Sequence, residues 1–343
     1  MTSEERKARE LERLRSDLST IDLSELNENI RCISTGVVAF DLAMGGGWPE
    51  SRFSEIFGEW QSGKSLIMYQ SIKECQAAGG LAFLDDSERA FDKRWARALG
   101  INLDELFYFI STSIEHGFEH LEKVCHEVRK SPEFRDVPIL YVKDSLAASI
   151  AKEEADMTFE KTGIALQARA VSKGLRRLTN LIADQRVAVV FVNQIRTKVG
   201  VMFGPSSEST GGRAPKFYAG MRIGLYKKSK IKRAGRIVGM GGLFDVVKSK
   251  IGVPWRQVKF QMLLKTGVHA LSGLFEYFIS ESVIKQLTTR SFEFAGDRFK
   301  RQDFPAMWAD AGKREALLME YKRVQEEGVD EEPQVAEGSS EEE

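Results

Sequence analysis

The sequence predicts an α/β fold in which a mostly parallel, twisted sheet carries helices on both faces. From about residue 31, short apolar runs typical of buried strands alternate with helical stretches. This alternation implies right-handed crossovers and parallel neighbouring strands. Residues 58–65 also read Gly-Glu-Trp-Gln-Ser-Gly-Lys-Ser, which matches G-x-x-x-x-G-K-[ST]. A phosphate-binding loop of this kind needs a strand before it and a helix after it, and residues 52–57 and 66–78 have those patterns.

The elements are expected in a definite order along the chain. Residues 4–30 alternate charged residues with leucine and isoleucine, which predicts a helix and a short connector. This segment has too few apolar positions to be stable alone, so we expect it to pack on another surface. The strands that follow are predicted over Phe53–Phe57, Leu81–Asp85, Leu106–Ile110, Ile139–Val142 and Val187–Val192. A nucleotide should bind at the carboxyl ends of these strands.

The chain changes character after the fifth strand. Residues 195–212 contain four glycines, one proline and little periodicity, which predicts a long functional loop. Further strands are predicted over Met221–Tyr226, Leu243–Val247 and Val258–Leu264, and they should be antiparallel because the links between them are short or polar. A small mixed unit follows to about residue 324. Residues 326–343 carry many acids and no base, which predicts a disordered acidic tail.

Charge and composition narrow the class of protein. The net charge is zero, but residues 211–244 contain nine lysines and arginines and no acid. This basic run could contact a polyanion, and a solvated charged surface is the alternative. No stretch of eighteen apolar residues occurs and the N-terminus has no hydrophobic segment, so we expect a cytoplasmic protein. The three cysteines lack disulfide or zinc spacing and are expected to be free thiols.

Two residues could hold a magnesium ion beside the phosphates. Ser65 closes the phosphate-binding motif, and Asp144 follows the strand Ile139–Val142. A carboxylate at that strand end could hold Mg²⁺ through water beside the Ser65 hydroxyl. The alternative for Asp144 is an ordinary helix N-cap.

Hydrolysis also needs a group that orients the attacking water. Glu88 lies just after the strand Leu81–Asp85 and is the best candidate, although Asp85 or Asp86 could take the role. Gln194 ends the fifth strand and opens the long loop. Its amide could sense the γ-phosphate and move the loop, and an ordinary strand-end amide is the alternative.

Several motifs together resemble the bacterial RecA recombinases in order and spacing. They are Ile33-Ser34-Thr35-Gly36, the loop at residues 58–65, Asp144-Ser145, Asn193-Gln194-Ile195-Arg196, Gly200-Val201-Met202-Phe203-Gly204, Thr210-Gly211-Gly212, Lys216-Phe217-Tyr218-Ala219 and Val247-Lys248-Ser249-Lys250. The resemblance covers about residues 31–265 and continues more loosely to 320. It implies a RecA-like P-loop NTPase core in a DNA-dependent ATPase that uses ATP and Mg²⁺. Such a protein forms a helical filament on single-stranded DNA, pairs it with homologous duplex DNA and exchanges strands, in the cytoplasm and associated with the nucleoid.

The resemblance also implies roles for residues around ATP. The nucleotide-binding residues would be Gly58, Glu59, Trp60, Gln61, Ser62, Gly63, Lys64 and Ser65, with Asp92 and Trp95 holding the adenine. Ser65 and Asp144 would bind Mg²⁺, Glu88 would activate water, and Gln194 would couple the nucleotide to the loop. Lys248 and Lys250 would reach the ATP of the neighbouring subunit. Lys216 and Phe217 would lie at that interface, although the sequence alone also allows Phe217 to be a core aromatic.

The family's two DNA-binding loops match residues from about 157 to 164 and from 195 to 211, in that order. The candidate DNA-binding residues are Ile164, Arg169, Arg176, Arg196, Lys198, Val199, Gly211 and Gly212. Ile164 and Val199 match positions at which the family wedges apolar side chains between bases. A buried aliphatic is the alternative for Val199, and its polar, glycine-rich loop argues against that alternative.

We therefore expect four segments. Residues 1–32 would be an N-terminal helix and oligomerisation segment, 33–266 the ATPase core, 267–324 a small α+β C-terminal domain and 325–343 the acidic tail. A basic and aromatic surface for gathering duplex DNA is expected in the third segment, from Lys285, Arg290, Phe292, Phe294, Arg298, Phe299, Lys300 and Arg301. Half of these residues could instead belong to a core.

Four features depart from the family's pattern. The loop interior lacks the usual proline, and Leu264 stands where a second aromatic often lies near the base. Ser87 is an extra residue before Glu88, as in phage recombinases, and Lys143 interrupts an otherwise apolar strand. We infer a divergent member, compatible with a phage or plasmid origin. Two rival functions remain at this point: a ring-shaped motor that unwinds DNA, and a non-catalytic recombination mediator.

Overall fold

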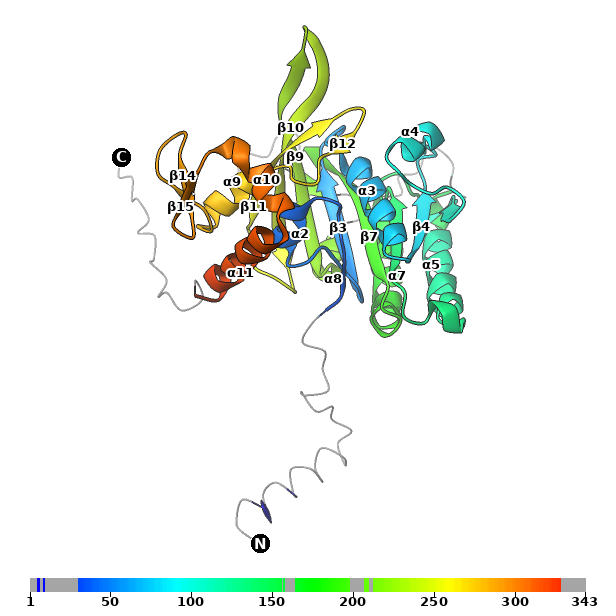
Figure 1. Ribbon diagram of the computed structural model, residues 1–343. Coiled ribbons are helices and arrows are strands. Elements are labelled where there is room, and N and C mark those ends of the chain that lie inside the picture. Colours follow the sequence, from blue (N-terminus) through cyan, green and yellow to red (C-terminus); the bar gives the residue numbers. More distant parts are fainter. Residues whose placement is uncertain are drawn as a thin grey trace, which may run out of the picture.

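The computed structural model describes residues 5–6, 9, 30–155, 157, 164–197, 207–209 and 212–327. Its central sheet has a parallel part that consists of β3 (Arg52–Gly58), β7 (Ala188–Thr197), β6 (Ile139–Asp144), β4 (Leu81–Asp86), β5 (Leu106–Phe109) and the start of β9 (Met221–Arg233). An antiparallel part continues beyond β9 with β10 (Arg236–Ser249), β11 (Gln257–Leu263) and β12 (Gly267–Val268). The strand order is β12-β11-β10-β9-β3-β7-β6-β4-β5 (Figure 1). The predicted α/β class with a mostly parallel sheet is confirmed.

Helices cover both faces of the parallel strands, which explains their continuous apolar runs. One face carries α2 (Val38–Met44) and α3 (Lys64–Ala77), and the other carries α5 (Ile114–Val128) and α7 (Ile164–Asp184). Alternate residues of β7 enter the two cores: Val190 and Val192 lie in the first, Val189 and Phe191 in the second. The sheet therefore separates two hydrophobic cores. Shorter helices are α4 (Lys93–Ala98), α6 (Lys152–Ala155) and α8 (Ala214–Tyr218).

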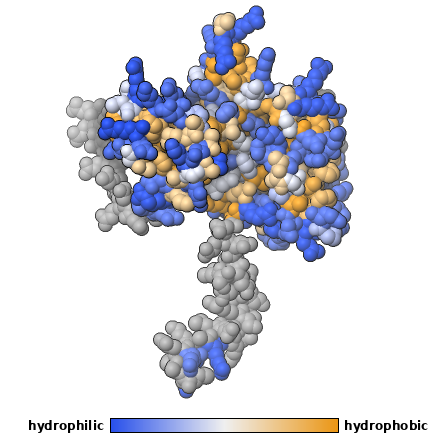
Figure 2. Space-filling view, in the orientation of Figure 1, coloured by the Kyte–Doolittle hydropathy of each residue, from blue (hydrophilic) through white to orange (hydrophobic). Residues whose placement is uncertain are grey.

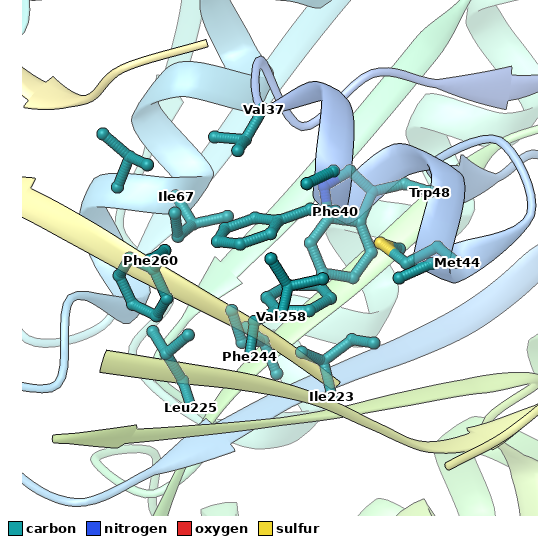
Figure 3. Packing of buried hydrophobic residues seen from close by; sticks show 14 of the residues in the cluster. Val37, Phe40, Met44, Trp48, Ile67, Ile223, Leu225, Phe244, Val258 and Phe260 are labelled. Atoms are coloured by element: carbon teal, nitrogen blue, oxygen red, sulfur yellow. The ribbon is translucent and has the colours of Figure 1, made fainter. Parts of the chain in front are cut away.

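Aromatic packing joins α2 to the antiparallel strands. Phe40 stacks on Phe244 with ring centroids 3.9 Å apart and meets the edge of Phe260 at 5.2 Å (Figure 3). Trp48 is fully buried beside them, and its indole N–H donates to the Ser71 hydroxyl at 2.8 Å. Trp48 belongs to β2 (Trp48–Pro49), which pairs with β1 (Cys32–Ile33). This packing fixes the strands that flank the phosphate-binding loop.

The strands β9 and β10 are much longer than predicted and form a protruding arm (Figure 1). Their turn lies at Ala234 and Gly235, which both have positive φ values, as in the tight turns of twisted hairpins. The prediction ended the strands too early because it counted only apolar residues, whereas most residues of the arm are exposed and polar. Figure 2 shows mostly hydrophilic side chains at its tip.

The predicted long loop after the fifth strand is partly a β-ribbon. The strand β7 continues to Thr197 and pairs in antiparallel fashion with β8 (Ser207–Ser209). The prediction of loop structure from residue 195 is wrong at these flanks, because backbone pairing needs no apolar periodicity. Residues 198–206 and 210–211 lie outside the described part of the chain.

The C-terminal unit packs on the core. It contains α9 (Leu274–Ser280), α10 (Phe304–Ala309), α11 (Ala311–Glu327) and a small sheet of β13 (Lys285–Gln286), β14 (Phe292–Phe294) and β15 (Asp297–Phe299). Short 3₁₀ turns lie at η2 (Pro132–Phe134) and η3 (Arg301–Asp303). The hydroxyl of Tyr321 donates to the Leu42 carbonyl at 3.0 Å, and Phe275 joins the core of α2 and α3. The unit is therefore anchored by a shared hydrophobic core.

The remaining predictions concern the two terminal segments, the cysteines, and membrane or metal sites. The predicted N-terminal helix over residues 4–30 and the acidic tail lie almost wholly outside the described chain. The three cysteines are free, and burial raises each thiol pKa to about 12. Among the described residues, no helix is long and apolar enough to cross a membrane, and no group of three or more acids, histidines or cysteines is arranged to hold a metal ion.

Candidate functional site

The phosphate-binding motif forms a tight loop between β3 and α3. Gly58 closes β3, and a Cβ atom there would lie 2.2 Å from the Leu225 carbonyl oxygen, so only glycine fits. Gly63 has a φ of 95° and directly precedes α3, a left-handed conformation that glycine adopts without strain. Both glycines of the motif are therefore required by the backbone. The start of α3 faces the loop and favours an anion.

Lys64 lies inside this loop. Its side chain is buried, and its Nζ donates to the carbonyl oxygens of Gly58 at 3.2 Å and Glu59 at 2.8 Å. Burial lowers the pKa of Lys64, and the carboxylates of Asp144 and Glu88 act against that shift. An ammonium group enclosed in a loop at a helix start suits the phosphates of a nucleotide.

The candidate magnesium ligands meet at the carboxyl edge of the sheet. The Ser65 hydroxyl is close enough to the Asp144 carboxylate to act to lower its pKa, but burial is the larger effect and raises the pKa of Asp144 to about 6. The strand β6 ends at Asp144 and a turn follows, so the alternative of a helix N-cap at Asp144 is wrong. A hydroxyl and a carboxylate side by side are oxygen donors of the kind that Mg²⁺ prefers.

Glu88 is the accessible acid of the predicted trio. Its Oε1 accepts hydrogen bonds from the Ser145 hydroxyl at 2.5 Å and from the Gln194 amide at 3.3 Å. Asp85 is fully buried in an ion pair, and Asp86 accepts from the Phe91 N–H and from a tyrosine hydroxyl. Both are occupied, which leaves Glu88 as the acid that a water molecule can approach.

Gln194 joins the nucleotide side to the long loop. It lies opposite Gly58 in the register of β3 and β7, three residues before β7 ends. Its side chain contacts Glu88, so the structure brings together the two residues that were predicted to activate water and to move the loop.

The predicted adenine contacts lie on α4. The Asp92 carboxylate caps that helix by accepting from the N–H groups of Arg94 at 2.8 Å and Trp95 at 3.1 Å. Trp95 is half-buried and packs against Tyr69, which lies one helical turn beyond Ser65. Leu264 is 55% exposed. Trp95 is thus near the phosphate loop, while Asp92 is used as a cap.

The predicted interface residues lie at the other end of the same strands. Lys248 of β10 pairs in register with Arg222 of β9, which pairs with Glu55 of β3. The Nζ of Lys248 donates to the carbonyl oxygens of Lys216 and Phe217 at 2.8 and 3.1 Å. Burial lowers the pKa of Lys248. Phe217 is 71% exposed, so the alternative that it is a core aromatic is wrong.

Lys250 is also exposed on this end of the sheet. Lys248 is level with Glu55 in the middle of β3, and Lys250 lies further towards the start of that strand. Because the phosphate loop follows the end of β3, Lys250 does not line the site of its own chain. The face made of Lys216, Phe217, Lys248 and Lys250 is called the amino-end face below.

Of the candidate DNA-binding residues, Arg169 and Arg176 are exposed on α7. A Cβ atom on Gly212 would lie 3.1 Å from Cβ of Ala168, so the end of the second loop reaches α7. Ile164 begins α7 and Arg196 lies in β7, but neither side chain is described. Lys198, Val199 and Gly211 lie outside the described residues, as do residues 158–163 of the first loop.

Two buried polar groups near the site were not predicted. Lys143 of β6 forms an ion pair with Asp85 of β4 at 2.7 Å. Glu55 of β3 accepts from Asn193 at 2.9 Å and from Arg222 at 2.6 Å. The available signal was a charged residue within a strand that is otherwise apolar, since such residues must be paired when buried.

Comparison with known proteins agrees with this architecture. Residues 6–269 match the family model described as the RecA N-terminal domain. The chain is also 36% identical over 258 residues to Protein RecA of Acinetobacter baylyi, a stretch that covers 75% of this chain and 72% of that relative. The resemblance drawn from the motifs is thereby confirmed, and the chain belongs to the RecA family of recombinases.

Proposed function

We propose that the protein is a DNA-dependent ATPase that forms a helical filament on single-stranded DNA, pairs it with homologous duplex DNA and exchanges strands. The observation that carries this proposal is the continuous set of contacts from Ser65 through Asp144 and from Ser145 through Glu88 to Gln194. Those contacts run from the phosphate loop to the strand that opens the second loop. They support a nucleotide site that is coupled to a nucleic-acid contact.

The residues fit ATP and Mg²⁺. Lys64 would neutralise phosphate charge, and Ser65 and Asp144 would hold the metal ion. When bound, the magnesium nucleotide supplies the phosphoanhydride bond that is broken. Glu88 would orient the attacking water and take up its proton, while its hydrogen bond from Ser145 keeps the carboxylate on the open side of the loop.

Gln194 would connect hydrolysis to DNA. Its amide donates to Glu88 Oε1 at 3.3 Å, and a phosphate oxygen would compete with Glu88 for this donor. A shift of this side chain between the two acceptors would move the end of β7 and, with it, the second loop. The Gln194 amide would thus have two positions, one on Glu88 and one on a phosphate oxygen. Through such a two-state element, a bound nucleotide can change the affinity of the protein for DNA.

The amino-end face supports a site shared between protomers. Its lysines lie at the opposite end of the sheet from the phosphate loop, and Phe217 is exposed. In a head-to-tail assembly, this face of one protomer can reach the nucleotide of the next. ATP between two protomers would stabilise the filament, and hydrolysis would weaken it.

A matched pair of lysine variants tests the core of the proposal. Lys64→Ala should lose ATP hydrolysis in the presence of single-stranded DNA by about 100-fold or more, because phosphate charge is no longer neutralised. Lys73→Ala, at a partly exposed position of the same helix, should hydrolyse at the parental rate. Parental hydrolysis by the Lys64 variant would refute the assignment.

The two rival functions predict different results. A ring-shaped motor should displace an annealed strand from DNA without homology, and a mediator should keep its function when Glu88 is replaced by Gln. We expect exchange only between homologous strands and loss of turnover in that variant.

A further inference from the structure

The two departures from the family pattern near Glu88 lie against each other. Lys143 of β6 stands directly opposite Asp85 of β4, and their side chains are 2% and 0% exposed. Ser87 follows β4, and its hydroxyl accepts from Lys143 Nζ at 2.9 Å. Lys143 and Ser87 are therefore partners in one buried group.

The ammonium group of Lys143 is held in one orientation. It has three N–H donors, and the structure gives it three acceptors: Asp85 at 2.7 Å, Ser111 at 2.8 Å and Ser87 at 2.9 Å. With every donor used and no exposure to water, the lysine cannot rotate without leaving a buried charge unpaired. The group is rigid, and Ser87 is its connection to the site.

Ser87 in turn is fixed on all sides. Its N–H donates to the Asp144 carbonyl at 2.8 Å, and its hydroxyl also accepts from Ser149 at 3.0 Å. The single hydroxyl hydrogen of Ser149 is shared between Ser87 and the carbonyl of Ser145 at 3.1 Å, and the Ser145 hydroxyl donates to Glu88. Glu88 follows Ser87 by one peptide bond, so its backbone and its carboxylate depend on the same group of contacts.

We propose that Lys143 and Ser87 are a positioning pair that holds the Glu88 carboxylate where it can orient the attacking water. This inference rests on the proposed role of Glu88 in hydrolysis. The buried ammonium does not touch the nucleotide. It fixes Ser87, and Ser87 fixes the start of the loop that carries Glu88. This matters because a small displacement of a catalytic group strongly reduces the rate of the reaction.

Ser111 provides a matched control. Its hydroxyl accepts from the same Lys143 Nζ at nearly the same distance and lies 3.2 Å from the Ser87 hydroxyl, but Ser111 follows β5 and has no peptide link to Glu88. Ser87→Ala and Ser111→Ala each remove one acceptor from the ammonium. Both should lower the melting temperature. Ser87→Ala should lower kcat of DNA-stimulated ATP hydrolysis by about tenfold, and by clearly more than Ser111→Ala does, with an unchanged KM for ATP.

A second variant protects the test against misfolding. Lys143→Met combined with Asp85→Asn leaves no charge of this pair buried. In the parent, the Asp85 carboxylate accepts from the Ser111 N–H at 3.0 Å, and the side-chain carbonyl of the new Asn can accept the same hydrogen bond. We expect this double variant to fold and to lose kcat as Ser87→Ala does. Parental kcat in either variant, or equal losses in Ser87→Ala and Ser111→Ala, would overturn the inference.

The Glu88→Gln variant separates this failure from that of the proposed function. If Glu88→Gln is inactive while Ser87→Ala is fully active, only the positioning role is wrong. If Glu88→Gln hydrolyses ATP at the parental rate, the proposed role of Glu88 fails, and the positioning role fails with it.

Discussion

The two ends of β3 differ in how many of the predicted site residues contact one another within a single chain. At the carboxyl end, the predicted chemical groups contact one another within a single chain: Ser65 with Asp144, and Glu88 with Gln194. At the amino end, Phe217 is 71% exposed. The first end is an organised site, and the second is a surface of charge and apolar area that the described residues of the chain do not cover.

This difference has a consequence for function. Lys250 and Phe217 can contribute to catalysis only if a second protomer brings its own phosphate loop to them, since both are far along the sheet from Gly58. The contrast predicts that substitutions at the two ends will fail in different ways. Variants at the carboxyl end should assemble without hydrolysing, and variants at the amino end should also form less stable filaments.

The largest effect is expected from Glu88→Gln. Without a carboxylate to orient water, DNA-stimulated hydrolysis should fall by about 100-fold or more, while filaments should still form with ATP. Phosphate release and electron microscopy measure the two properties on the same sample. Loss of filaments together with hydrolysis would show that the carboxyl end is also needed for assembly and would remove the contrast.

The next effect tests whether the two ends form one site. Lys64→Ala and Lys250→Ala should each abolish most hydrolysis alone. In an equal mixture, about one quarter of the interfaces should combine an intact phosphate loop with an intact Lys250, so activity should recover to about that fraction. Each variant mixed with itself is the control. No recovery would contradict the shared site.

A smaller effect concerns stability. Burial raises the pKa of Asp144 to about 6, so the folded protein bears a cost at pH 8, where the carboxylate must stay ionised. This cost disappears as the pH falls below the ordinary aspartate pKa near 4. Without Mg²⁺, Asp144→Asn should therefore be more stable than the parent by about 1–2 kcal/mol at pH 8.

That gain should shrink between pH 6 and pH 4, as denaturant titrations at several pH values can measure. With Mg²⁺ and ATP the order should reverse, because only the parent binds the metal ion. A gain that stays constant with pH would mean that the carboxylate is not the cause.

The smallest effect is expected on the arm of β9 and β10. Replacing Lys230 and Lys232 by Gln should weaken binding to single-stranded DNA and reduce the slope of log K against log salt by about 1 to 2, if both lysines contact phosphates. Lys123 and Lys130, exposed on and just after α5, offer a control pair of equal charge. If the slope of log K against log salt is the same in both double variants, the lysines of the arm do not contact DNA phosphates and the arm is only a solvated charged surface.

Much of the carboxyl end could be predicted from sequence. Gly58, Gly63 and Lys64 are defined by a local motif whose backbone geometry allows few alternatives. The mostly parallel sheet and the burial of both its faces follow from apolar runs that alternate with helices. These features depend on short-range patterns, which a single sequence contains.

The remaining features depend on contacts between distant segments. Lys143 and Asp85 are 58 residues apart, and their pairing follows from the register of β4 and β6, which no local pattern specifies. The length of the arm was underestimated because exposed strands lack apolar alternation. The exposure of Phe217 could not be deduced either, since an aromatic residue is more often buried.

The most direct test of the shared site is electron microscopy of the protein with single-stranded DNA, Mg²⁺ and a slowly hydrolysed ATP analogue. We expect helical filaments in which Lys248 and Lys250 of one protomer face the phosphate loop of the next. Rings, free monomers, or filaments in which the amino-end face is turned away from the neighbouring nucleotide would contradict the account.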